Sequence, residues 1–244
     1  MGCRAFGLVS MRSVVSTEVE SEQDVLTTAT TSTVETVAFT ELDGAAYAIK
    51  RVVDRVAALA LLLALAFPIT LIALAIKLTS PGPVFVKQMR VGRFGKPFVF
   101  YKFRSMLRDA ELLRDGLEDD NVHDGPTIFK MRRDPRVTAV GRFMRRTSID
   151  ELPNLFNVLR GDMSLIGPRP PLPREVAHYT PRDMQRLAAV PGMTGLWQVR
   201  GRSEIPFEDM VEIDLEYIER WSLWLYLYIV LKTPIAVVGG RGAW

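Results

Sequence analysis

Residues 56–76 read VAALALLLALAFPITLIALAI and contain no charged side chain. An α-helix rises about 1.5 Å per residue, so a helix of this length matches a bilayer hydrocarbon core of roughly 30 Å. Pro68 lies in the middle of the stretch, where it removes one helical hydrogen bond and crowds the preceding turn. The sequence therefore predicts a membrane helix with a kink or break at Pro68.

Basic residues flank this apolar stretch on both sides. They are Lys50, Arg51 and Arg55 before it, and Lys77, Lys87, Arg90 and Arg93 after it. Basic flanks favour the cytoplasmic side of a membrane, so both ends are drawn to the same side. A helix that enters the bilayer, bends and returns satisfies both flanks, and we favour this re-entrant arrangement. A single straight span is the alternative.

The remaining sequence divides into an acidic leader and a basic body. The 244-residue chain has a formal net charge of +3. Residues 1–45 hold seven acidic and two basic residues, which leaves 21 acidic and 29 basic residues in the remainder. We predict a disordered Ser/Thr-rich leader over 1–45, the membrane helix over 46–80 and a folded domain over 81–244. A basic body behind a membrane segment favours anionic partners such as lipid headgroups, phosphates or nucleic acid.

The predicted folded domain mixes strand and helix patterns. Residues 98–106, FVFYKFRSM, alternate as a strand does and place Lys102 and Arg104 on one face. Helical periodicity returns near residues 148–159 and again over 207–220. Residues 221–231 are apolar with interleaved Trp and Tyr, a pattern that suits a membrane–water interface or an ordinary buried helix equally well.

The run TSIDELPNLFNVLRGDMSLIGPRP, Thr147–Pro170, holds two adjacent acids at the entry to a predicted helix. Ser148 and Glu151 have the spacing of a capping box, although Pro153 argues against a helix that starts so early. In either register, Asp150 and Glu151 lie near the positive end of the helix dipole, which favours their ionised forms. An ionised aspartate can act as a nucleophile or hold Mg²⁺, although two acids at a helix start are usually only a cap.

Basic residues near these acids raise the interest of the run. Arg145 and Arg146 precede the two acids, and Arg169 follows between two prolines that restrict where its guanidinium can point, which suits phosphate binding. The segment PGMTGLWQVRGR ends at Arg202 and either offers backbone N–H groups to a phosphate or forms a plain turn. Lys102 and Arg104 are further candidate phosphate ligands, the alternative being a solvated strand face.

Taken together, these runs resemble the bacterial sugar transferase family of monotopic polyprenyl-phosphate phosphoglycosyltransferases. The matching segments are KRVVDR before the apolar stretch, KLTSPGPVFVKQMRVGRFGKPFVFYKFRSM after it, and then DPRVTAVGRFMRRTSIDELPNLFNVLRGDMSLIGPRP and PGMTGLWQVRGR. The similarity runs from about Lys50 to the C-terminus, roughly four-fifths of the chain. A series of long motifs in one order is far more specific than any single motif.

The resemblance implies a bacterial inner (cytoplasmic) membrane protein whose catalytic domain faces the cytoplasm and depends on Mg²⁺. With the patterns above, we expect an α+β fold: a mainly helical cytosolic catalytic domain with short strands and a C-terminal interfacial helix, fused to an N-terminal re-entrant membrane helix broken at Pro68. The implied substrates are a UDP-sugar and polyprenyl (undecaprenyl-type) phosphate, and the implied role is to start exopolysaccharide or glycoconjugate assembly.

The resemblance also implies a two-step mechanism. The aspartate that matches Asp150 attacks the β-phosphate of the UDP-sugar, releases UMP and carries the phosphosugar until the polyprenyl phosphate attacks it. Glu151 matches the second acid, which assists with metal or proton handling, and Asp150 is the implied metal ligand. Arg145 and Arg169 match phosphate-binding arginines, and Asp214 matches an acid of uncertain role.

Two departures and two rival functions accompany this interpretation. Longer relatives carry several transmembrane helices before this core, and small relatives often have Ser where Phe67 precedes the proline, which leaves the sharpness of the bend open.

One rival is a non-enzymatic, membrane-anchored basic protein that binds anionic lipid or nucleic acid. The other, a polytopic sugar-phosphate transferase, needs many membrane spans. We expect membrane lipid but no nucleic acid as a partner; a homodimer is compatible with the sequence, and the sugar is not determined by it.

Overall fold

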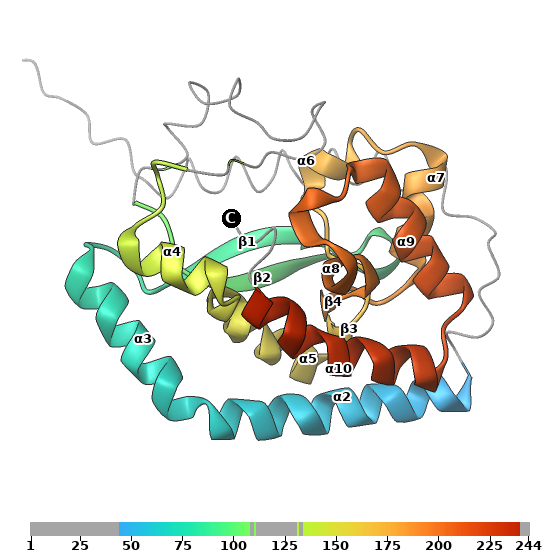
Figure 1. The fold of residues 1–244 in the computed structure, drawn as a ribbon, viewed down its shortest axis with the longest axis horizontal. Helices are drawn as coiled ribbons and strands as arrows, with labels where there is room; N and C mark the ends of the chain where they lie inside the picture. The colour runs from blue at the N-terminus through green and yellow to red at the C-terminus, as the bar shows by residue number, and fades with distance from the viewer. Residues whose placement is uncertain (1–43, 108–109, 111–130, 132–133, 240–244) are drawn as a thin grey trace, which may run out of the picture.

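The structure, a computed structural model, describes residues 44–107, 110, 131 and 134–239 (Figure 1). The leader predicted over residues 1–45 lies almost wholly outside these ranges. Helices predominate and the strands are short, in agreement with the predicted α+β class. In chain order the elements are α2 (Ala45–Ala64), α3 (Ala66–Thr79), β1 (Phe85–Val91), η2 (Arg93–Gly95), β2 (Pro97–Phe103), α4 (Ala139–Arg146), η5 (Ile149–Asn154), α5 (Leu155–Arg160), β3 (Ser164–Ile166), α6 (Pro173–Val176), α7 (Pro181–Met184), η6 (Gln185–Ala188), β4 (Gly192–Thr194), α8 (Leu196–Arg200), η7 (Arg202–Glu204), α9 (Phe207–Glu219) and α10 (Leu223–Gly239).

The apolar stretch forms two helices that meet at a sharp bend. The axes of α2 and α3 differ in direction by 62°. The break lies at Leu65, with φ −95° and ψ 4°, three residues before the predicted position. Pro68 occupies the first turn of α3, where its missing N–H costs no hydrogen bond, while its ring would clash with the carbonyl four residues earlier in a continuous helix. The proline therefore interrupts the helix one turn ahead of itself.

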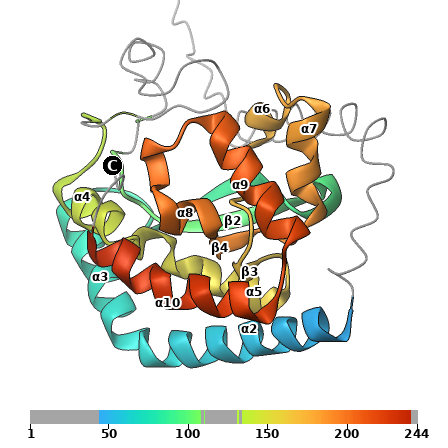
Figure 2. The same ribbon diagram turned by 45° about the vertical axis from the view of Figure 1, so that its right-hand side comes forward.

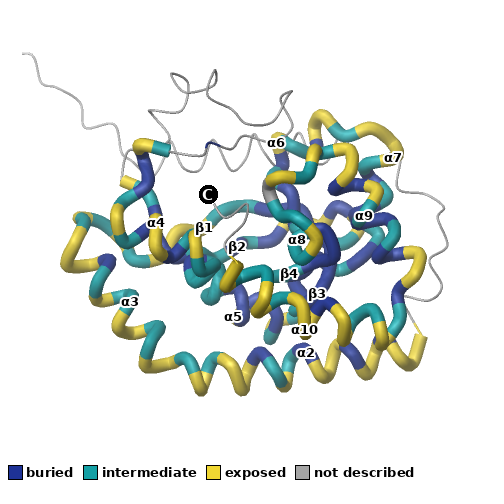
Figure 3. The backbone as a smooth tube through the Cα atoms, viewed as in Figure 1, coloured by how far each residue is buried: buried dark blue, intermediate teal, exposed yellow. Residues whose placement is uncertain are grey.

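The outer edge of this bent pair is apolar and exposed. Within the described ranges no single helix is long and apolar enough to cross a bilayer, but α2 and α3 together have the necessary length and composition. Leu63, Phe67 and Leu78 are 71%, 73% and 76% exposed, and exposed residues line the outer edge of both helices (Figure 3). Contiguous apolar surface of this kind marks a contact with lipid or with another protein.

The first half of α2 is fixed to the folded domain by a buried ion pair. Lys50 Nζ lies 3.0 Å from Asp54 Oδ2, and both side chains are almost completely buried. Lys50 also donates to the carbonyl of Ile166 at 3.0 Å and to the hydroxyl of Ser164, which in turn donates to Asp54. Lys50 is therefore neutralised inside the fold, so the basic flank before the apolar stretch consists of Arg51 and Arg55.

The C-terminal helix completes this buried polar group. Helix α10 runs beside α2 in both views (Figures 1 and 2), and the Tyr226 hydroxyl donates to Asp54 Oδ1 at 2.8 Å. The largest apolar cluster fills the space between α2, α9 and α10, with Tyr47, Leu215 and Trp221 among its members. Residues 221–231 thus have one buried side, although Trp224 is 81% exposed on the other.

Two small sheets position the loops of the domain. Strands β1 and β2 form an antiparallel hairpin in which Phe85 pairs with Phe103 and Val91 with Pro97, so the strand predicted over 98–106 is present but ends earlier. Strands β3 and β4 are parallel. Gly167 and Gly192 approach so closely beside this pair that a Cβ on Gly192 would lie 2.1 Å from the Gly167 nitrogen, which explains both glycines.

Candidate active site

The two adjacent acids lie on a short 3₁₀ helix between α4 and α5. Ser148 precedes it in the left-handed region, with φ 55° and ψ 18°, and its side chain makes no capping hydrogen bond. Ser148 therefore forms no capping box with Glu151, in keeping with the argument from Pro153 against so early a helix start. Pro153 cannot donate the i→i−4 hydrogen bond of an α-helix, so the chain forms the 3₁₀ segment η5 first and begins α5 only at Leu155.

Two buried asparagines fasten this turn to strand β2. Asn154 Oδ1 accepts a hydrogen bond from the backbone N–H of Tyr101 at 2.9 Å and another from Asn157 Nδ2 at 3.0 Å. The same Asn157 nitrogen donates to the carbonyl of Val99 at 2.9 Å. Both asparagines are fully buried, and they set the distance between the acids and the Lys102 that β2 carries. Sequence reasoning missed them because each resembles an ordinary polar residue of a helical surface.

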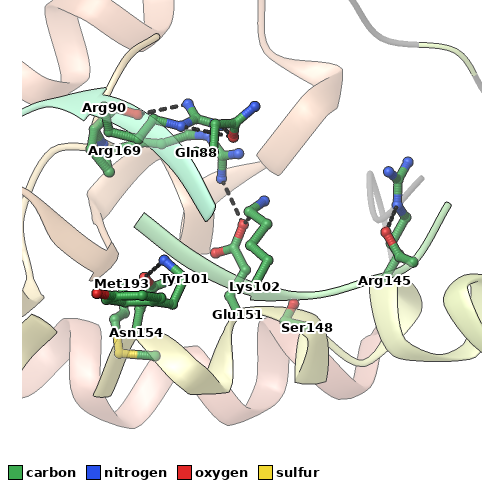
Figure 4. Close-up of polar contacts among 12 residues, drawn as sticks. Gln88, Arg90, Tyr101, Lys102, Arg145, Ser148, Glu151, Asn154, Arg169 and Met193 are labelled. Carbon is green, nitrogen blue, oxygen red and sulfur yellow. Dashed lines mark hydrogen bonds and ion pairs between the residues drawn. The ribbon is translucent and has the colours of Figure 1, made fainter. Parts of the chain in front are cut away.

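Glu151 is held by two cations from distant parts of the chain. Lys102 Nζ lies 2.8 Å from Glu151 Oε1, and Arg169 Nη1 lies 3.4 Å from the same oxygen. Figure 4 shows both side chains directed at this carboxylate. Burial alone would raise the pKa of Glu151, but the charges of Lys102 and Arg169 outweigh it and hold the pKa well below its ordinary value. Glu151 is therefore ionised, as the sequence predicted.

Asp150 has a different environment although it is the adjacent residue. Its side chain is buried, and no hydrogen bond or ion pair with another residue in the described part of the chain engages its carboxylate. Burial raises the pKa of Asp150, the charge of Lys102 lowers it, and the negative charge of Glu151 raises it again; the net direction is upward. The helix-end argument for an ionised Asp150 is therefore outweighed by burial, and its carboxylate is the unengaged member of the pair.

Two arginines flank the acids, and each is anchored by a serine hydroxyl. Arg145 Nε donates to Ser105 Oγ at 3.1 Å, and Arg202 Nη2 donates to Ser148 Oγ at 2.8 Å. Both arginines interact electrostatically with the acids: burial lowers the pKa of Arg202 while the charge of Glu151 opposes that shift, and the charge of Arg145 opposes the rise that burial causes in the pKa of Asp150. The structure thus gathers four of the predicted basic residues, namely Lys102, Arg145, Arg169 and Arg202, around the two acids.

The loop that carries Arg169 is held by hydrogen bonds on both sides. Arg90 Nη1, from β1, donates to the carbonyl of Pro170 at 2.9 Å (Figure 4). On the other side the backbone N–H of Gly192 donates to the carbonyl of Pro168 at 2.8 Å. Because the Gly192 N–H already donates to the Pro168 carbonyl, it is not available to donate to a phosphate. Arg90 was counted only as a membrane-flanking charge, yet it is 95% buried here and also lowers the pKa of Glu151.

Two predicted site residues lie outside this cluster. Arg104 follows the end of β2 and turns away to Ser80, whose carbonyl and hydroxyl accept from Nη2 at 2.7 and 2.6 Å. The predicted shared face of Lys102 and Arg104 is lost because the strand ends between them. Asp214 is fully buried in α9 and pairs with Arg186 at 2.5 Å. Burial raises the pKa of Asp214 to about 6, against the opposing charge of Arg186.

The donor set restricts how a divalent cation would bind. No group of three His, Cys, Asp or Glu side chains suited to a metal occurs among the described residues. Mg²⁺ commonly uses one or two protein carboxylates and completes its coordination with substrate phosphates and water. The unengaged carboxylate of Asp150 fits that requirement, whereas Glu151 is already occupied by Lys102 and Arg169. These residues fit Mg²⁺ only together with a phosphate-bearing substrate.

Comparison with known proteins identifies one family. The family model described as "Bacterial sugar transferase" matches residues 45–240. The chain is 44% identical to the undecaprenyl-phosphate galactose phosphotransferase of Salmonella typhimurium over 80% of its own length and 42% of the relative's. It is 47% identical to a UDP-glucose:undecaprenyl-phosphate glucose-1-phosphate transferase of Caulobacter vibrioides, over 75% of this chain and 67% of that protein.

A shorter relative aligns over most of its length. The exopolysaccharide production protein ExoY of Rhizobium meliloti is 38% identical over 80% of this chain and 88% of that protein. In contrast, the chain spans about two fifths of the length of longer relatives such as the Salmonella protein. The range that the family model matches includes the residues that form the cluster around Asp150 and Glu151.

Proposed function

The chain belongs to the bacterial sugar transferase family, and on that basis we propose that it transfers a sugar 1-phosphate from a UDP-sugar to a polyprenyl phosphate. The names of its relatives, which specify galactose or glucose and undecaprenyl phosphate, support this substrate class. The observation that carries the proposal is the pair of acids among four basic side chains, with one carboxylate engaged and the other free. A non-enzymatic lipid- or nucleic-acid-binding protein has no need of such an arrangement.

In the proposed reaction Asp150 is the nucleophile. A carboxylate oxygen of Asp150 forms a bond to the β-phosphorus of the UDP-sugar, and the bond from that phosphorus to the bridging oxygen breaks, so that UMP leaves. An oxygen of the polyprenyl phosphate then attacks the same phosphorus and releases the carboxylate. The product is a polyprenyl diphosphate sugar. Two such displacements replace a direct transfer between a water-soluble donor and a lipid acceptor.

The basic residues stabilise the negative charge that builds on the phosphate oxygens. Lys102 and Arg169 are oriented by Glu151, while Arg145 and Arg202 are oriented by serine hydroxyls, so all four are held before a substrate arrives. Preorganised cations contribute most of the catalysis in phosphoryl transfer. Asp150 and the donor's phosphates would hold Mg²⁺, which, when bound, neutralises charge on the diphosphate. Glu151 acts mainly as the anchor that positions Lys102 and Arg169.

We propose that the bent helix pair is re-entrant, with the domain on the cytoplasmic side of the inner membrane. Both ends of the pair pack against the same folded domain: Lys50 near the start of α2 is buried beside β3, and Ile76 near the end of α3 is buried with Phe103 and Met144. The exposed apolar edge at Leu63 and Phe67 then lies in the lipid. This arrangement brings the acids to the surface of the bilayer that holds the acceptor.

Replacement of Asp150 tests the reaction. Membranes that contain the protein are incubated with a panel of radiolabelled UDP-sugars and polyprenyl phosphate, and both UMP release and label in the lipid fraction are measured. We expect Asp150→Asn to abolish both, because an amide cannot form the acyl-phosphate intermediate, while membrane association is unchanged. Asp162→Asn, in a surface pair with Arg160, is the matched control. Transfer at the wild-type rate by Asp150→Asn would exclude the covalent mechanism, and the panel would identify the sugar.

A further inference from the structure

Ser148 and Arg202 share an uncommon backbone conformation and bond to each other. Their φ angles are 55° and 54°, and among described non-glycine residues only Phe94 also has a positive φ. The side chains meet at 2.8 Å, with Arg202 Nη2 donating to the serine hydroxyl. A left-handed backbone is strained for a residue with a Cβ, and such residues persist mainly where the surrounding structure requires them at functional sites.

The Ser148 hydroxyl has no local structural task. It makes no capping hydrogen bond to η5, and the turn is closed by backbone groups instead: the Ser148 N–H donates to the Arg145 carbonyl at 3.1 Å. Ser148 precedes Asp150 by two residues and lies beside Glu151 in Figure 4. The left-handed turn therefore directs a hydroxyl acceptor at an arginine from a distant loop, at the point where the nucleophile is presented.

Arg202 has unused hydrogen-bonding capacity at this point. Its Nη1 is buried and has no partner among the described residues. A buried guanidinium nitrogen without an acceptor is costly, and an anion that entered the site would satisfy it. Burial lowers the pKa of Arg202, but the charge of Glu151 opposes this. The arginine thus has one nitrogen fixed to Ser148 and another available to a ligand.

We propose that Ser148 is a positioning residue that holds Arg202 at the turn that carries Asp150 and Glu151, so that Nη1 donates to no internal acceptor and is left to donate to a phosphate oxygen of the nucleotide sugar. This inference rests on the proposed function and adds to it a residue that touches neither substrate nor metal. It explains why a serine occupies a left-handed position where glycine would be less strained.

Two substitutions at this position separate positioning from turn formation. Ser148→Gly removes the hydroxyl and relieves the backbone strain, whereas Ser148→Ala removes the hydroxyl and keeps the strain. We expect both to lower kcat/KM for the UDP-sugar by roughly tenfold or more, the size expected for a hydrogen bond to a charged group. We expect the glycine variant to melt at or above the wild-type temperature. Thr147→Ala, whose hydroxyl bonds only carbonyls of α4, is the matched control and stays near wild type.

A double-mutant cycle then tests the link to Arg202. If Ser148 acts through Arg202, the losses of Ser148→Gly and Arg202→Met overlap, and the double variant is little worse than Arg202→Met. Binding of UDP, followed by its thermal stabilisation of the protein, should weaken in both single variants. Full activity and UDP binding in Ser148→Gly, or losses that multiply in the double variant, would overturn this inference. If the wild type transferred no sugar phosphate from any UDP-sugar, the proposed function itself would fail. The comparison of UDP binding between the wild type and the Ser148 variants would still test whether Ser148 positions Arg202.

Discussion

Asp150 and Glu151 are adjacent in the sequence but differ in what surrounds each carboxylate. Lys102 and Arg169 reach Glu151 from β2 and from the proline-bounded loop, while Asp150 is buried and unengaged. The sequence predicted both acids and most of the basic residues near them as site residues, because charged residues cluster along the chain itself. It could not predict which acid is paired, since that depends on how strand β2 and the 3₁₀ turn lie against each other.

The charges of Lys102 and Glu151 act in opposite directions on the pKa of Asp150, so substitutions of these two residues should shift the pH dependence of activity in opposite directions. The proposed reaction needs Asp150 ionised, so we expect activity to fall as the pH drops through the raised pKa of Asp150. Lys102 lowers this pKa, so Lys102→Gln should move the acid limb of kcat/KM to higher pH. Glu151 raises it, so Glu151→Gln should move the limb to lower pH.

The measurement is the pH profile of UMP release for each variant, whatever its absolute rate. Arg182→Gln, which breaks an exposed pair with Glu212 far from the acids, serves as the control and should leave the acid limb where it is in the wild type. Shifts in the same direction for Lys102→Gln and Glu151→Gln would show that a group other than Asp150 controls the limb.

At the scale of elements, the sequence patterns predicted where helices lie more reliably than which of their residues are buried. Helix α9 covers Phe207–Glu219, within a residue of its predicted range, because its apolar periodicity is regular. Lys50 was counted only as a membrane-flanking charge, yet it pairs with Asp54, and both are buried against β3 and α10. Such burial depends on contacts with residues more than a hundred positions away, and a local pattern contains no information about them.

This buried pair predicts a large difference between single and double substitutions. Lys50→Met leaves Asp54 buried without its counter-charge, so we expect the free energy of unfolding to fall by about 3–5 kcal/mol. Lys50→Met combined with Asp54→Leu should recover much of the loss, because no unpaired charge remains. Thermal and denaturant melts in detergent measure both. Arg51→Met, at the exposed neighbouring position, is the control. An equal loss of unfolding free energy in Arg51→Met would show that the loss in Lys50→Met does not come from the buried pair.

At the scale of the whole molecule, both ends of the bent pair are attached to one folded domain. Lys50 bonds to the Ile166 carbonyl, and Ile76 packs with Phe103 and Met144. If the pair crossed the bilayer, one of these attachments would have to break, because the two ends would be separated by a hydrocarbon core of roughly 30 Å. The sequence predicted a bend from Pro68 and a return from the basic flanks on both sides, and the packing of the two ends against one domain is a second, independent argument for the proposed return.

Accessibility of single cysteines tests this topology. Cys3 is the only cysteine, so Cys3→Ser gives a background into which Arg51→Cys or Lys87→Cys, both at exposed positions outside the bend, is introduced. A re-entrant pair leaves both flanks on the cytoplasmic side, so a membrane-impermeant maleimide should label neither in intact spheroplasts and both in inverted vesicles. Phe67→Cys, at the bend, should react in neither preparation because the lipid covers it. Labelling of one flank from each side would establish a spanning helix, and the packing of Lys50 or of Ile76 against the domain would then have to be abandoned.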